Sequence, residues 1–166
     1  MKGALLGGHQ LTVIFADEIL ADYHQFYLAD ASGDFELPEN WTAIALSQRV
    51  LAAAQALVFS TARNMKVPVR VELHEKPVAV PRDCDHAVAA SLSTGGQLVV
   101  AGLSDYLPDA PRLSVPPGFL RVLVASFGLA TLSADGMNGE DRYDVYLWPA
   151  PFSEMEVSRQ WTEAAC

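Results

Sequence analysis

Three neighbouring side chains, Cys84, Asp85 and His86, are of the types that perform nucleophilic chemistry. A thiol beside an imidazole can be activated as a thiolate. Neighbouring side chains on a strand point to opposite faces, however, so Asp85 would not join Cys84 and His86 on one face. We therefore interpret these residues as structural and expect no catalytic dyad.

An oxygen-rich loop at residues 135–141, Asp-Gly-Met-Asn-Gly-Glu-Asp, carries side chains that calcium uses as ligands. It lacks the alternating ligand order and the final glutamate of an EF-hand loop. The histidines are not spaced as zinc ligands either. They are His9, His24, His74 and His86. The sequence predicts no metal and no cofactor.

The motifs of common enzyme classes are missing. The sequence contains no G-x-S-x-G elbow, P-loop, dinucleotide fingerprint or H-E-x-x-H pair. A hydrolase site assembled from separate strands would leave no such motif, and it stays the weakest alternative. We predict that the chain is not an enzyme.

The excess of acidic over basic residues indicates which kinds of partner the chain can bind. Lys and Arg number 11 against 20 Asp and Glu, giving a formal net charge of -9. This charge repels a nucleic-acid backbone, so we expect no direct nucleic-acid binding and favour a basic protein partner. The simpler alternative is that the excess acid only maintains solubility.

Length and cysteine content indicate the class of protein. A chain of 166 residues, 51% of them hydrophobic, predicts a single domain spanning residues 1–166. Cys84 and Cys166 form neither a disulfide framework nor a zinc pattern, which predicts free thiols and a cytoplasmic location. The N-terminal segment lacks a signal-peptide cleavage site, and no apolar run approaches the ~20 residues that cross a bilayer, so we expect no membrane contact.

Alternating apolar and polar residues predict strands, most clearly at residues 67–74. Further strands are predicted at 11–15, 23–28, 86–92, 97–103, 119–127 and 143–148. Short strands without regularly interleaved helices favour a mainly β fold, an antiparallel β-sandwich with one short α-helix.

Two glycine-containing turns separate predicted strands. The paired glycines at residues 94–96 predict a hairpin whose flanking strands pair antiparallel. The Pro-Pro-Gly turn at 116–118 predicts a second reversal, followed by a central strand with Leu120, Val122 and Val124 on one face.

The one predicted helix begins with Asn40 as its N-cap. Apolar residues then recur at helical spacing. They are Leu46, Val50, Ala53 and Leu57. A β-branched and aromatic run after Leu57 favours a strand, so we place the change from helix to strand near residues 54–56. The last ten or so residues are predicted to form a flexible or helical tail.

The segment at residues 22–26 contains Tyr-His-Gln-Phe, which resembles the signature of the bacterial competence protein J family. The resemblance continues, in the same order of elements, through residues 41–64 and 113–124. It fades in an extended segment at 129–144 and in the tail. Members of that family inhibit the DNA-entry nuclease of transformation, so the resemblance implies a small cytosolic protein that binds and silences a nuclease. An acidic surface would occupy the basic, DNA-binding face of such an enzyme.

Interfaces depend on a few aromatic anchors within a polar rim. The candidate partner-binding residues are Tyr23, His24, Gln25, Tyr27, Asp135, Glu140 and Asp141. Strand alternation predicts that Tyr23, Gln25 and Tyr27 share one face, opposite His24 and Phe26. Further acidic candidates are Asp30, Asp34, Glu36 and Glu39. The simpler alternatives are a core position for each aromatic and a solvated loop for each acid.

The alternative function is a small-ligand-binding β-sandwich with a pocket lined by Trp41, Trp148 and tyrosines. An inhibitor predicts a flat or convex acidic surface. A ligand-binding protein predicts a concave apolar cavity with a few polar groups.

Overall fold

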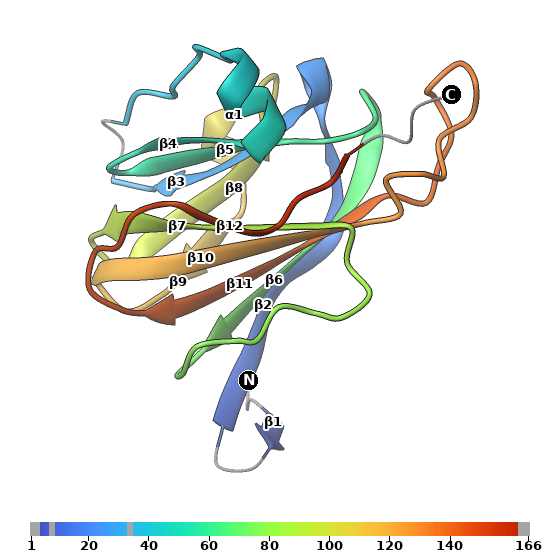
Figure 1. Cartoon of the computed structure of the whole chain (residues 1–166). Helices are drawn as coiled ribbons and strands as arrows, with labels where there is room; N and C mark the ends of the chain where they lie inside the picture. Colours follow the sequence, from blue (N-terminus) through green and yellow to red (C-terminus); the bar gives the residue numbers. More distant parts are fainter. Residues whose placement is uncertain (1–3, 7–8, 33–34, 163–166) are drawn as a thin grey trace.

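The computed structural model describes residues 4–6, 9–32 and 35–162. Within them, one sheet has seven strands in the order β1-β2-β6-β11-β10-β7-β12, and a second has five in the order β4-β5-β3-β8-β9. The sheets lie face to face as two layers (Figure 1). The predicted mainly β, sandwich-like fold with a short helix is confirmed. Because β6 and β11 pair in parallel, the larger sheet is mixed.

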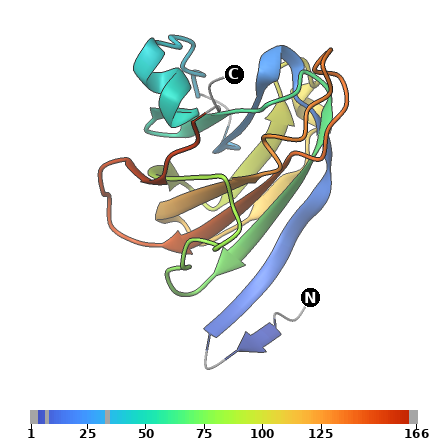
Figure 2. The same cartoon turned by 45° about the vertical axis from the view of Figure 1, so that its right-hand side comes forward.

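The elements have the following bounds. They are β1 (Ala4–Leu6), β2 (His9–Leu20), the 3-10 turn η1 (Asp22–His24), β3 (Gln25–Asp30), α1 (Ala43–Gln48), β4 (Val50–Ala53), β5 (Ala56–Ser60), β6 (Lys66–His74), β7 (His86–Thr94), β8 (Gln97–Gly102), the 3-10 turn η2 (Leu107–Asp109), β9 (Arg112–Ser114), β10 (Gly118–Phe127), β11 (Arg142–Pro149) and β12 (Glu156–Arg159). Figure 2 shows the hairpin of β1 and the start of β2 extending beyond the rest of the larger sheet.

Apolar side chains are buried in three layers. The main layer lies between the sheets and includes Val67, Val69 and Val71 of β6, which confirms the predicted alternation. A second layer on the larger sheet includes Trp148 and packs against the 75–85 connection, and a third includes Tyr27 under residues 31–41. Both sheets therefore bury apolar side chains on their outer faces as well as on the faces that meet in the core.

The predicted helix is wrong in its bounds. Thr42, not Asn40, caps α1, because its Oγ1 accepts a hydrogen bond from the backbone nitrogen of Ala45 at 3.1 Å. Arg49 ends the helix with a left-handed φ of 65°, and Val50 already begins β4. Pairing of β4 with β5 outweighs the helix propensity of the alanine-rich run.

The predicted hairpin at residues 94–96 is also wrong, because β7 and β8 belong to different sheets. The connection is held by Asp30 of β3, whose Oδ1 accepts hydrogen bonds from Thr94 Oγ1 at 2.7 Å and from the Gly95 nitrogen at 3.0 Å. These bonds lead the chain across to the smaller sheet. The central position predicted for the strand after residue 118 is confirmed, since β10 lies between β11 and β7.

The chain end is partly strand. Residues of β12 pair antiparallel with β7, so the predicted flexible or helical tail is wrong for 157–159. Residues 163–166 lie outside the described part of the chain. In that described part, no helix is both long and apolar enough to cross a membrane.

Candidate functional site

A strained turn connects the two sheets. η1 joins β2 of the larger sheet to β3 of the smaller one, and both Tyr23 (φ 58°) and His24 (φ 61°) lie in the left-handed region. Non-glycine residues reach this region at a cost of about 1–2 kcal/mol each. Such strain persists only where surrounding structure holds it, and it concentrates at functional sites. The turn is therefore the first candidate site.

Backbone hydrogen bonds hold the turn from three sides. The nitrogen of Ala21 donates to the Met65 carbonyl at 2.9 Å, and that of His24 donates to the Ala21 carbonyl at 3.0 Å. The Thr61 nitrogen donates to the His24 carbonyl at 2.8 Å. With its backbone fixed, the Tyr23 side chain stays 70% exposed. A rigidly presented aromatic loses little entropy on binding, which is typical of an interface anchor.

A shallow groove of about 340 Å³ lies beside the turn. It is lined by Tyr23, His24, Gln25, Trp41, Leu46, Ser60 and Thr61. Helix α1 contributes Leu46 and also carries Ile44, and both side chains are exposed. Apolar surface beside an exposed tyrosine suits a protein interface better than a solvated rim.

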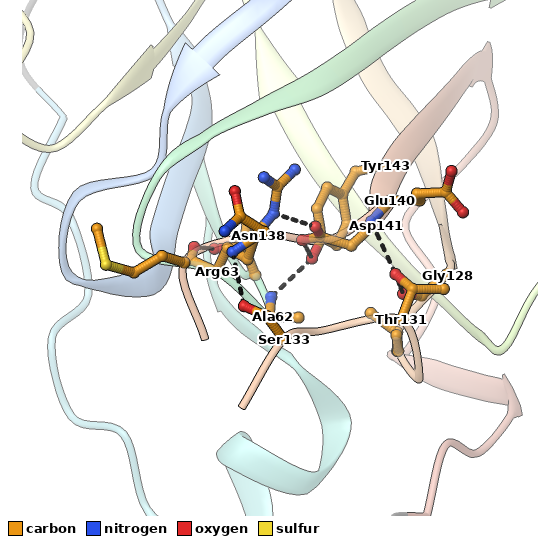
Figure 3. Close-up of polar contacts among 12 residues, drawn as sticks. Ala62, Arg63, Gly128, Thr131, Ser133, Asn138, Glu140, Asp141 and Tyr143 are labelled. Atoms are coloured by element: carbon orange, nitrogen blue, oxygen red, sulfur yellow. Dashed lines mark hydrogen bonds and ion pairs between the residues drawn. The ribbon is translucent and has the colours of Figure 1, made fainter. Parts of the chain in front are cut away.

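The second predicted patch, in residues 128–141, rests on a buried polar network (Figure 3). Asp141 is 0% exposed and accepts hydrogen bonds from Arg63 Nε at 2.5 Å and from the Tyr143 hydroxyl at 2.7 Å. The same hydroxyl accepts a bond from the Ala62 nitrogen at 2.6 Å. Burial raises the pKa of Tyr143, so its phenol stays protonated as the donor. This network fixes the base of the loop.

The loop is also bonded internally. The Glu140 nitrogen donates to Thr131 Oγ1 at 2.7 Å, and the Ser133 nitrogen donates to the Asn138 carbonyl at 2.8 Å (Figure 3). Gly128 has a φ of 68°, and a Cβ there would meet the Glu140 carbonyl oxygen at 2.5 Å, so only glycine fits. The loop is thus a preformed surface feature.

The tip of this loop displays an acid and an apolar residue. Oδ1 of Asp135 accepts bonds from Ser133 Oγ at 2.5 Å and from the Met137 nitrogen at 3.0 Å. The Ser133 bond, followed by the Met137 bond, lowers the pKa of Asp135. Asp135, Met137 and Glu140 are all exposed. The tip therefore presents negative charge around a methionine.

The two predicted patches lie side by side. Residues 61–63 form the link: Thr61 bonds the His24 carbonyl, and Arg63 bonds Asp141. The η1 turn and the 128–141 loop consequently flank one short segment at the same end of the sandwich. We call this surface the turn-and-loop site, defined by Tyr23, His24, Gln25, Leu46, Asp135, Met137 and Glu140.

Two predicted contact residues are wrong for a surface. Asp141 is buried in the network, and Tyr27 is only 3% exposed, with its ring centroid 5.9 Å from that of Phe35. Burial raises the Tyr27 pKa. Tyr23 and His24 precede β3 rather than belonging to it, so alternation begins at Gln25 and does not pair Tyr23 with Tyr27. Partner binding stays a prediction for the exposed residues.

The acidic candidates before the helix differ in their exposure to solvent. Asp30 is buried and holds the 94–96 connection. Its burial alone would raise the pKa, but hydrogen bonds from Ser32, Thr94 and Gly95 together lower it. Glu36 and Glu39 are exposed, and Asp34 lies outside the described residues.

Sequence reasoning missed the exposed apolar members of the site. Helical spacing groups Leu46 with other apolar residues on one face, and nothing in the spacing of Met137 or Ile44 distinguishes them from core residues. Their exposure follows from the short α1 and from the fixed path of the loop.

The Cys84 and His86 side chains have structural partners. His86 Nδ1 accepts a bond from the Trp161 nitrogen at 3.0 Å, and its Nε2 lies 2.9 Å from the Gln48 carbonyl oxygen. Burial lowers the pKa of His86 and raises that of Cys84. Across the described part of the chain, no group of three or more His, Cys, Asp or Glu side chains is placed to hold a metal ion.

The predicted ligand pocket has the wrong lining. Trp41 packs on the outer face of the smaller sheet, whereas Trp148 packs on the outer face of the larger one. The two indoles therefore cannot line one pocket.

The fold places the chain in the class of two-sheet β proteins with a ComJ-like arrangement. It is similar to the crystal structure of ComJ, inhibitor of the DNA-degrading activity of NucA, from Bacillus subtilis, with a TM-score of 0.64 and 17% identity over 84% of this chain and 98% of that one. It is also similar to crocagin biosynthetic gene J, with a TM-score of 0.55 and 18% identity over 86% of this chain and 99% of that one. At these low identities, the TM-scores show a shared fold and nothing further. No family model and no curated protein matches the sequence.

Proposed function

We propose that this chain is a non-enzymatic protein-binding module that inhibits a nuclease through the turn-and-loop site. The observation that carries the proposal is the strained η1 turn, which displays Tyr23 beside the preformed 128–141 loop. The similarity in fold to an inhibitor of a DNA-degrading protein supports the choice of partner. A cytoplasmic location belongs to the same proposal.

Charge favours a basic partner surface. Asp135 and Glu140 are exposed on the loop, and the chain carries a net charge of -9. Arg63, a cation at the base of the site, is already paired with Asp141. Opposite charge on a DNA-binding surface would speed association, and the bound inhibitor would block DNA by occupying that surface. The exposed apolar side chains of the site, Tyr23, Leu46 and Met137, would then slow dissociation.

The test is a direct inhibition assay. The tagged chain is used to capture partners from a lysate of its source organism at low and moderate salt, and each purified partner is assayed for DNA degradation with increasing amounts of the chain. A basic nuclease that is inhibited at stoichiometric concentration supports the proposal. Absence of any inhibited nuclease overturns it.

Matched variants assign the surface. Tyr23→Ala should weaken inhibition at least tenfold, the effect typical of an interface anchor. Glu140→Gln should slow association and reduce its salt dependence. Glu75→Gln makes the same change in charge beside His74 and Pro149, at the other end of the larger sheet, and should have no effect. Equal effects of Glu140→Gln and Glu75→Gln would argue against this site.

A further inference from the structure

A second candidate site lies at the opposite end of β10 from the 128–141 loop. It is a groove of about 470 Å³ between β4, β7 and the connection from β11 to β12. Its lining is mostly apolar and includes Ala53, Ala90, Phe119, Phe152 and Met155. The volume lies within the range of small-molecule sites. Because the length of β10 separates it from the turn-and-loop site, its occupancy is independent of the proposed function.

Two aromatic side chains form one wall of the groove. Phe119 is 47% exposed and Phe152 is 61% exposed, and their rings pack edge to face with centroids 6.0 Å apart. Exposing two large apolar rings is unfavourable in water, and a ligand that covers them recovers this loss. The floor opposite consists of alanines at residues 52–54 and 90, whose small side chains leave the space open.

The far wall is fixed by hydrogen bonds, so the groove is preformed. Ser91 Oγ accepts a bond from the Ser153 nitrogen at 3.0 Å and donates to the Ser153 carbonyl at 3.1 Å. Arg121 donates from Nη1 to the Ser153 carbonyl at 2.9 Å and from Nη2 to the Glu154 carbonyl at 2.7 Å. The Arg121 guanidinium and the Ser91 hydroxyl are therefore already hydrogen-bonded to the backbone of residues 153–154.

One charged side chain remains for a ligand. Glu154 lines the groove, and its carboxylate makes no hydrogen bond or ion pair with the described residues. A carboxylate beside apolar and aromatic surface favours a cation, through charge and through cation–π contact with the rings. We propose that this groove binds a small organic cation, an apolar ring or chain carrying an amine.

The probe for this site is 2-(2-naphthyl)ethylamine, titrated into the full chain and followed by backbone amide NMR shifts. We expect saturable shifts at residues 52–54 and 153–155, and weaker binding of 2-naphthylacetate, which has a similar ring and the opposite charge. Glu154→Gln should weaken amine binding about two- to five-fold, as expected for a partly exposed ion pair. Glu156→Gln, an exposed acid on β12 outside the groove, is the matched control.

Two further variants test the apolar part without touching the core. Phe152→Ala removes half of the aromatic wall and should weaken binding about three- to ten-fold. Ala54→Leu places an exposed side chain into the open space and should block the probe. The proposal is overturned if the amine gives no saturable shifts, if the acetate binds equally well, or if both substitutions leave binding unchanged while the spectra show a folded protein.

Discussion

Tyr143 donates a hydrogen bond to Asp141 over 2.7 Å, and both side chains are fully buried. Tyr143 belongs to β11, and Asp141 is the last residue before that strand. Through Arg63 and Ala62 the pair joins the 128–141 loop to the segment beside η1. The predicted acidic contact is thus a support beneath the candidate surface.

Removing this hydroxyl should destabilise the fold. Tyr143→Phe leaves the Ala62 N–H and one Asp141 oxygen without their partner, and each buried unsatisfied group costs about 1–3 kcal/mol. Urea denaturation should show the loss as a lower midpoint with an unchanged slope. Tyr106→Phe makes the same chemical change at an exposed tyrosine and should stay within about 0.5 kcal/mol of the parent. Equal midpoints for the two variants would contradict a structural role of the hydroxyl.

The strain at η1 predicts that glycine at residue 23 gives a more stable protein than alanine, the reverse of the usual order. Glycine in an ordinary strand or helix is about 0.5–1 kcal/mol less stable than alanine. At a φ of 58° the order should reverse, because alanine retains the left-handed penalty of about 1–2 kcal/mol. Tyr23→Gly should therefore have the higher free energy of unfolding, measured by urea denaturation, while both variants lose the partner equally. A more stable Tyr23→Ala would show that the turn is not held in this conformation.

Arg159 should control the reactivity of Cys84. Its Nη1 donates to the carbonyl oxygens of Pro81 and Cys84, each at 3.0 Å, and of Arg82 at 2.8 Å, which pins the 75–85 connection over the thiol. Arg159→Ala should loosen this cover and speed labelling of Cys84 by Ellman's reagent by about tenfold or more, the equivalent of one lost charged hydrogen bond. Although burial raises the pKa of this thiol, the guanidinium lowers it, so loss of the guanidinium opposes the effect, and a pH series of labelling rates separates access from thiolate fraction.

The parent and each variant in this experiment also carry Cys166→Ser, so that only Cys84 reacts. Arg112→Ala is the control, because Arg112 also bonds backbone carbonyls, those of Leu107 and Ala110, but far from Cys84. If Arg159→Ala labels no faster than Arg112→Ala, Arg159 does not hold the cover.

Stability should fall in mildly acidic solution because of His86. Burial lowers its folded-state pKa, so below its ordinary value of about 6.5 the unfolded chain binds a proton that the folded chain does not. The free energy of unfolding is unaffected by this group above that pH and decreases as the pH falls toward the lowered pKa.

Urea denaturation between about pH 7.5 and 5 measures this slope. His86→Gln offers a hydrogen-bond acceptor to Trp161 and a donor to Gln48 without titrating, and should flatten the curve. An unchanged slope in His86→Gln would assign the acid sensitivity to other groups.

Elements with a strong local pattern were predicted well. Alternation along β6 gave its buried valines, and the Pro-Pro-Gly turn preceded a central β10. Failures occurred where two local structures were equally compatible with the residues. The helix predicted from Asn40 ended early because Val50 pairs with Phe59, and the strands flanking residues 94–96 separated because Asp30 holds the turn from another strand.

For the candidate site, too, the sequence indicated the segments but not the exposure of each side chain. The Tyr-His-Gln-Phe segment is a candidate because it resembles a family signature, and the acidic loop is a candidate because of its residue types. Which of their members reach solvent was decided by contacts far apart in sequence, since Phe35 covers Tyr27 and Arg63 binds Asp141. No local pattern reports those partners.

The sequence by itself therefore determined the strand content, the acidic charge and the segments that carry the candidate residues, because periodicity, charge and turn chemistry act over a few neighbouring residues. Only the tertiary structure decided that η1 and the 128–141 loop share one end of the sandwich, and that Tyr23 is displayed while Tyr27 is buried. The reason is that exposure and adjacency depend on which strands pair and which loops cover them, and these choices are made by packing between distant segments.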